Sequence, residues 1–307
     1  MSTFVALLRR ELWEHRSLVI VPGALAALIL ASVIGSSIYG LLHGGAIGLI
    51  IGGHAMDSFD SFSDAKSGQF IPAFYLGMLI CFGVVLSVSL PLYLIDCLYS
   101  DRRDRSILFW KSLPISDAET VMSKLTTGLL VAPAVALIAA FVTTFVLAVA
   151  GSIVLWLGGV EGVSSLWQPG PLMRSIVGAP VIALLILLWY APVAAWCLLA
   201  SAWAPRAPLL WATLPPIALI IAEQVTFRTT HVPEFLGDRM GGVFWRLFDT
   251  SGGFTGFGVH DGELSGGLPA VRDLVAYLTS MDLWGGIAAA AVFTAGAIAL
   301  RRYRDET

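Results

Sequence analysis

Few side chains in this sequence are spaced in a pattern that is typical of catalytic sites. The dipeptide Gly-Lys does not occur, so the phosphate-binding loop G-x-x-x-x-G-K is absent. The five histidines show no H-E-x-x-H or similar metal-ligand spacing, and no G-x-S-x-G hydrolase motif occurs. His54 and Asp57 lie close together, but such a pair in a loop is more often solvated than catalytic. We therefore expect no catalytic, cofactor-binding or metal-binding residues, and we expect that the chain is not an enzyme.

The segment Tyr99–Ser116, between the second and third apolar intervals, is the most distinctive. Ser116 and Glu119 form a capping box that predicts a helix start, and Pro114 ends any helix before it. The residues between leave room for a helix of about three turns. Its charged and aromatic side chains indicate a surface for docking a partner protein, with anchoring in lipid headgroups as the alternative. The candidate residues are Asp101, Arg102, Arg103, Arg105, Ile107, Phe109, Trp110, Lys111 and Leu113.

This segment resembles the cytoplasmic loop of ABC-2 type exporter permeases. That loop tends to read Glu-Arg, then Gly-Thr-Leu, a leucine pair, Pro, and later Gly-Lys. The matching positions are Asp101-Arg102, Arg105-Ser106, Ile107, Pro114 and Ser123-Lys124. The sequence departs from the family's pattern in having Asp for Glu and in having Arg105 and Ser123 at the two glycines.

The resemblance implies a permease subunit of an ATP-driven exporter in a bacterial cell membrane. A second permease subunit, in a homodimer or a heterodimer, and two copies of a separate ATPase that carries ATP and Mg would complete it. The absence of a phosphate-binding loop agrees with ATP hydrolysis on another chain. The family would transmit the ATPase movement through the helix at Asp101–Leu113 and an N-terminal interfacial helix. Apolar spans suit a hydrophobic or amphipathic cargo. A polytopic membrane enzyme or a non-transporting scaffold is the alternative.

A ladder of small residues follows the first apolar interval at every fourth position. Small residues allow close packing of helices in lipid. The ladder therefore predicts either an interface with another subunit or packing within the chain. Its members are Ser32, Ser36, Gly40, Gly44, Gly48 and Gly52.

These features belong to a chain whose composition requires a lipid environment. Of its 307 residues 57% are hydrophobic and 13% are charged, about half the charged share of soluble domains, and the mean hydropathy is +0.83. The formal charge of −3 offers no basic surface for nucleic acid. We expect an all-α integral membrane protein with the bilayer as its solvent. Residues 1–307 form one transmembrane domain, with six spans at about 17–42, 70–96, 120–157, 175–203, 207–225 and 283–300.

The fifth span is the weakest of the six, because Pro215-Pro216 removes backbone donors and is expected to break or kink a helix. Basic residues predict the orientation. With the N-terminus in the cytoplasm, two thirds of the 18 Lys and Arg residues lie on that side, so both termini are expected to be cytoplasmic.

Two shorter helices are expected beside the spans. Phe4, Val5, Leu8 and Leu12 lie on one side of an N-terminal stretch, which predicts a helix along the membrane surface; a simple basic flank is the alternative. In the long outer loop, about 223–282, Pro269 opens a second amphipathic stretch that is expected to lie on the outer leaflet, unless it is an ordinary loop helix. Its apolar residues are Val271, Leu274, Val275, Leu278 and Met281.

Overall fold

The computed structural model of the chain describes residues 3–42, 68, 70–104, 115–157, 162–242, 259–260, 263–264 and 277–303. Six helical segments in these ranges are long and apolar enough to cross a membrane. This confirms the expected all-α membrane architecture with six spans. The spans are α2 (Ser17–Leu42), α4 (Phe70–Arg103), a continuous run of α6 (Asp117–Thr126), η2 (Thr127–Val131) and α7 (Ala132–Leu157), then α8 (Pro169–Trp203), α9 (Pro208–Thr226) and α13 (Met281–Tyr303).

Shorter elements surround the spans. An N-terminal helix precedes α2, and two short helical segments follow α9. The only strands in the described residues are two-residue segments that pair antiparallel. These elements are α1 (Thr3–Glu14), η3 (Val163–Trp167), α10 (His231–Gly237), η4 (Asp238–Gly242), β1 (Val259–His260) and β2 (Glu263–Leu264).

Local sequence signals account for several helix starts. The capping box before α6 is confirmed: the Glu119 backbone N–H donates to the Ser116 hydroxyl at 3.1 Å, and the Ser116 N–H donates to the Glu119 carboxylate at 3.0 Å. Pro169 and Pro208 open α8 and α9, where the missing N–H of proline has no intrahelical acceptor to lose.

The helix α9 does not break at Pro215-Pro216 but runs through both prolines to Thr226. The fixed φ of proline is close to the helical value, and spanning helices tolerate the lost backbone hydrogen bonds. The fifth span is therefore one continuous helix, and of the two expected effects of the prolines, a break or a kink, the break does not occur.

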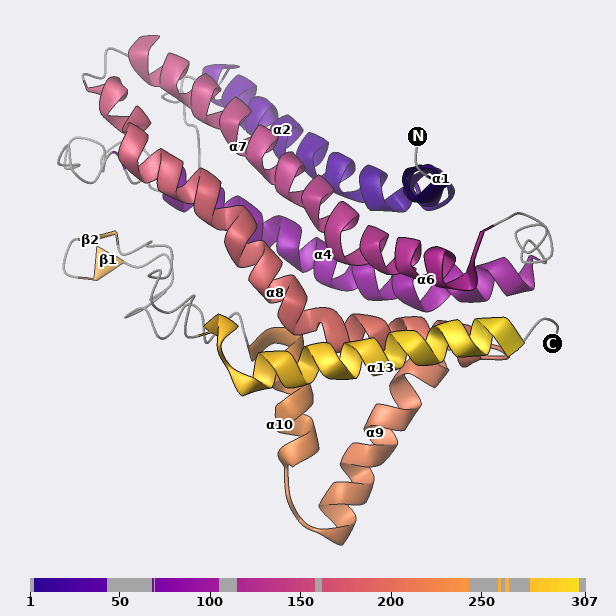
Figure 1. Cartoon of the computed structure of the whole chain (residues 1–307). Coiled ribbons are helices and arrows are strands. Elements are labelled where there is room, and N and C mark those ends of the chain that lie inside the picture. Colours follow the sequence, from indigo (N-terminus) through magenta and orange to yellow (C-terminus); the bar gives the residue numbers. More distant parts are fainter. Residues whose placement is uncertain are drawn as a thin grey trace.

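The bundle is built around α8. This helix packs against α13, α4 and α9, while α7 packs against both α4 and α2. Figure 1 shows that both chain termini lie at one end of the bundle, together with the end of α4 and the start of α6. We call this the termini end.

Small side chains allow the closest of these contacts. Ala191, Ala194 and Ala195 of α8 are buried, as are Ala290 and Ala297 of α13. Alanine at these positions lets two helix backbones approach closely, which is how helices associate in lipid. The buried positions of α13 recur at steps of three and four residues, so they form one continuous face of the helix. They are Leu283, Gly286, Ala290, Thr294, Ala297 and Arg301.

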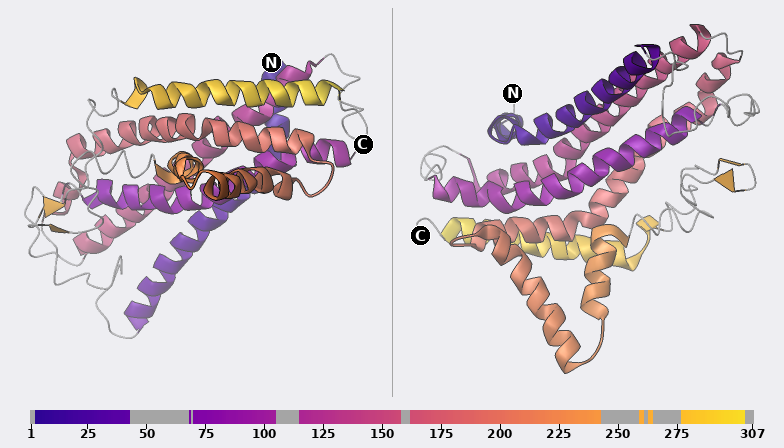
Figure 2. Two further views of the ribbon diagram at one scale, coloured as in Figure 1. Left: turned by 90° about the horizontal axis from the view of Figure 1, so that it is seen from below. Right: turned by 180° about the vertical axis from the view of Figure 1, so that it is seen from behind.

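On the other side of α8, the helices α9 and α10 form a V that projects from the bundle (Figure 2, right). Its returning arm is fixed by Arg239 in η4, whose side chain is buried. The Arg239 guanidinium lies over the Trp189 ring, 4.2 Å from its centre, and donates to the backbone carbonyl of Asp282. The Trp189 indole N–H in turn donates to the Asp238 carbonyl at 2.7 Å.

Gly286 and Gly285 offer a matched test of this anchor. A Cβ at Gly286 would overlap the Arg239 guanidinium, whereas a Cβ at Gly285 would meet nothing within 4 Å. We expect Gly286→Ala to destabilise the chain by about 1–3 kcal/mol, the usual cost of overpacking. Gly285→Ala should be neutral or slightly stabilising, because alanine has the higher helix propensity. Thermal unfolding of the two variants in detergent measures the difference; equal midpoints would contradict the tight fit around Arg239.

Candidate functional site

The helix α1 lies across the termini end of the bundle. Figure 1 views it nearly along its axis, while the spans run across the picture. It packs against α6 through its buried face, which is made of Leu7 and Glu11. Val5 and Trp13 are exposed. The expected N-terminal helix is therefore present, but Glu11 lies in its protein-facing side, where the sequence pattern placed only apolar residues.

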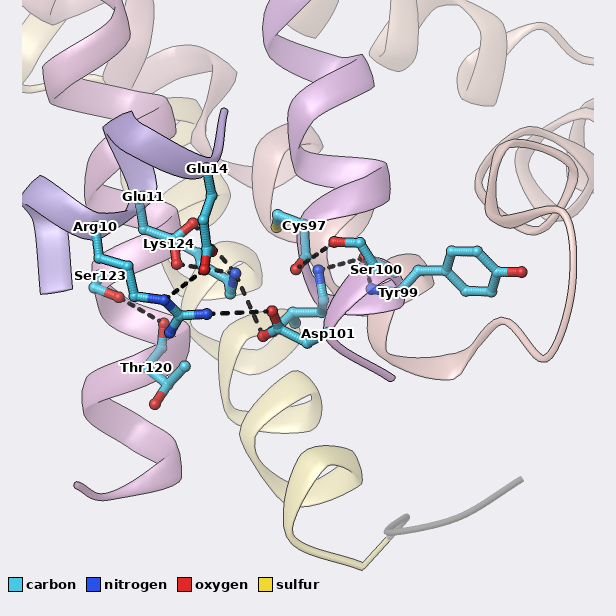
Figure 3. Close-up of polar contacts among 12 residues, drawn as sticks. Arg10, Glu11, Glu14, Cys97, Tyr99, Ser100, Asp101, Thr120, Ser123 and Lys124 are labelled. Carbon is cyan, nitrogen blue, oxygen red and sulfur yellow. Dashed lines mark hydrogen bonds and ion pairs between the residues drawn. The ribbon is translucent and has the colours of Figure 1, made fainter. Parts of the chain in front are cut away.

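Charged side chains converge where α1 meets the bundle (Figure 3). We call this group the charge cluster; its members come from α1, α4, α6 and α13. Glu11 is 1% exposed, Asp101 4% and Lys124 0%. Such charges are tolerated away from water only when they are paired. The charge cluster comprises Arg10, Glu11, Asp101, Asp117, Lys124 and Arg301.

Asp101 is the common partner of three cations from three helices. Its carboxylate lies 3.1 Å from the Arg301 guanidinium, 3.4 Å from the Lys124 Nζ and 3.8 Å from the Arg10 guanidinium. Asp101 therefore links the end of α4 to α1, α6 and α13 at a single point.

Lys124 joins α1 to α6. Its ammonium lies 3.0 Å from Oε1 of Glu11, and the Tyr93 hydroxyl donates to the other Glu11 oxygen at 3.1 Å. The His15 ring packs edge-on against Tyr93, with 4.8 Å between ring centroids. Burial lowers the pKa of His15 below its ordinary value, only partly offset by the carboxylate of Glu11. This direction favours the neutral form of the His15 ring beside Lys124.

Arg102, which follows Asp101 in α4, bonds to the end of α8. It donates to the backbone carbonyls of Ser201 at 2.7 Å and Ala204 at 2.9 Å, at the end of α8. The Ser201 hydroxyl accepts from the backbone N–H groups of Leu98 and Tyr99, each at 3.0 Å. The last turns of α4 thus hold the end of α8 as well.

The predicted docking residues are only partly described. Asp101 and Arg102 are engaged inside the bundle, whereas Arg103 is exposed and pairs with Asp104 at 3.0 Å. These three residues belong to the last turn of α4 rather than to a separate helix. The helix continues past Asp96 because a charge at the membrane boundary does not end it and no Pro or Gly follows there. The residues Arg105, Ile107, Phe109, Trp110, Lys111 and Leu113 lie outside the described residues.

The small-residue ladder is also only partly within the described residues. Ser32 is exposed and Ser36 is partly buried, and both hydroxyls donate to carbonyls of their own helix, α2. Gly40 lies in the last turn of α2. Gly44, Gly48 and Gly52 lie outside the described residues, as do Val271, Leu274 and Val275 of the expected outer helix. Leu278 stands just before α13, and Met281 is its first residue.

Sequence reasoning missed most of the charge cluster. Lys124 was noted only as part of the Gly-Lys position, and Arg10 and Arg301 only as basic flanks. Glu11 and Asp117 were not singled out. The sequence signal for the charge cluster is that single acidic residues stand among the basic residues beside the spans. This signal does not show which residues pair, because the six residues lie in four separate parts of the chain.

The arrangement links four helices through paired charges. Each carboxylate of the cluster has a cation within 3.4 Å, so its charge is already balanced. Among the described residues, no group of three or more His, Cys, Asp or Glu side chains could hold a metal ion.

Comparisons of the chain with protein-family models, with curated proteins and with solved structures find no match.

Proposed function

We propose that this chain is the permease subunit of an ATP-driven exporter of the ABC-2 type. Two ATPase subunits and a second permease subunit would complete the transporter, which would carry a hydrophobic or amphipathic substrate out of the cytoplasm. The excess of Lys and Arg at the termini end supports an orientation with that end in the cytoplasm.

The observation that carries the proposal is the charge cluster. Asp101 and Lys124, which both stand at positions of the ABC-2-like motif, form a buried ion pair at 3.4 Å. The segment 105–114 joins the helices that bear them, α4 and α6. A partner that binds this segment would act directly on two spans and, through Glu11 and Arg301, on α1 and α13. That linkage is suited to passing the movement of an external motor into a membrane domain.

Copurification tests the proposal. The tagged full-length chain is isolated in a mild detergent from the cells that produce it, and bound proteins are identified by mass spectrometry. We expect an ATPase subunit with a phosphate-binding loop, and ATP hydrolysis by the complex but none above background by the chain alone. Hydrolysis by the purified chain alone, or a complete absence of an ATPase after crosslinking in intact membranes, would contradict the assignment.

A further inference from the structure

The helices α1 and α6 are joined as one unit. They pack side by side, and the Glu11–Lys124 pair at 3.0 Å lies between them with almost no exposure. Separating them would take the buried Glu11 carboxylate away from the Lys124 ammonium, and breaking a buried ion pair costs several kcal/mol. We call these two helices the α1–α6 unit.

The contacts between this unit and the helices α4 and α13 include three ion pairs. Lys124 and Arg10 face Asp101 at 3.4 and 3.8 Å, and Asp117 faces Arg301 at 3.2 Å. Buried ion pairs add little net stability compared with apolar packing, although they select one geometry. We call this boundary the charged seam.

At its far end, α6 joins the rest of its span through the π-helical turn η2. The Ala132 N–H donates to the carbonyl of Thr127, five residues earlier, instead of four as in an α-helix. Gly128 in this turn lies against the Leu94 side chain, which a Cβ there would approach to 2.9 Å. Turns of this kind interrupt the regular hydrogen-bond ladder, and helices bend at them.

We propose that the α1–α6 unit pivots about η2 relative to α4 and α13, and that the charged seam holds it in the arrangement described above. The pair between α1 and α6 keeps the unit intact while the seam opens. Because the segment 105–114 leads directly into α6, a partner bound there would move the unit. That use of the pivot rests on the proposed function, whereas the pivot itself does not.

Distances between spin labels test the pivot on the full-length chain alone, in lipid nanodiscs. The thiol of Cys81 is exposed and is replaced by serine, while Cys97 and Cys197 are buried and stay. Labels at Met122 of α6 and Val292 of α13, both exposed, report across the seam. Labels at Met122 and the exposed Trp13 of α1 report within the unit.

Arg301→Gln removes the Arg301–Asp117 pair of the charged seam, together with the Arg301–Asp101 pair that joins α13 to α4. We expect it to add a second distance population to the Met122–Val292 pair and to leave the Trp13–Met122 pair unchanged. Arg301→Lys keeps the charge and should retain a single population. Deleting Leu130, an exposed residue of η2, should convert the π turn to a regular helix and suppress the second population in the Arg301→Gln background.

Three results would overturn the pivot. A change in both label pairs means that α1 separates from α6, and a change in neither means that the Asp117–Arg301 link does not hold the unit. If the second distance population persists after Leu130 is deleted, the movement does not occur about η2. If Arg301→Gln does not fold, Asp117→Asn decides, since it removes the same Asp117–Arg301 link of the seam from a partly exposed side chain and leaves the Arg301–Asp101 pair in place; it should also give a second population. Failure to find an ATPase contradicts the proposed function and leaves these distances unaffected.

Discussion

Replacing Lys124 by methionine is expected to be the most damaging single substitution in the charge cluster, with a loss of about 3–5 kcal/mol of stability. Lys124 has no solvent exposure and lies within 3.4 Å of both Glu11 and Asp101. Asp101 keeps Arg301 as a partner in this variant, but Glu11 keeps only the Tyr93 hydroxyl. The cost therefore arises mainly from a buried carboxylate that has lost its cation.

The thermal unfolding midpoint in detergent measures this effect. Arg103→Gln is the matched control, because the Arg103–Asp104 pair has similar geometry but is exposed, and exposed pairs contribute little. The double variant Glu11→Gln, Lys124→Met should recover part of the loss, because it removes both charges of the pair. A midpoint for Lys124→Met no lower than that of Arg103→Gln would show that the buried pair does not hold α1.

The second large effect concerns the proposed ATPase interface. Phe109 and Trp110 are the aromatic residues of the segment that follows α4. If they anchor an ATPase, each truncation to alanine should cost about 2 kcal/mol or more of binding free energy, which is more than tenfold in affinity. Arg105→Ala should be milder and salt-dependent, because a charge at the rim of an interface affects mainly the association rate.

A pull-down of the ATPase at two salt concentrations, with the amount of membrane-inserted chain measured in parallel, distinguishes the two interpretations of this segment. Docking predicts loss of the ATPase from a Phe109→Ala, Trp110→Ala variant that still inserts normally. Headgroup anchoring predicts the reverse, with the ATPase retained and insertion reduced. A double variant with a fully coupled ATPase would exclude docking through these aromatic side chains.

The pattern of apolar and polar residues along the sequence was sufficient to predict the membrane-spanning architecture. Apolar intervals long enough to cross a bilayer predicted six spans, and the described part of the chain contains six helices long and apolar enough to cross one. The capping box at Ser116 predicted a helix start because this signal acts within one turn of the backbone. Two helices run further than these local signals indicate: α9 continues through Pro215-Pro216, and α4 continues beyond the predicted end of its span at about 96 to Arg103.

The charge cluster, by contrast, depended on the tertiary structure. Hydropathy reports whether a segment is apolar, and periodicity reports which residues share a face, but neither says which faces meet. Close packing of the alanine-lined α8 and α13, and of α1 on α6, brings Glu11, Asp101, Lys124 and Arg301 to one point. In the sequence, Glu11 and Arg301 read as ordinary flanking charges, and Asp101 and Lys124 as parts of a loop motif. The burial and the pairing of all four are properties of the assembled helices and of no single segment.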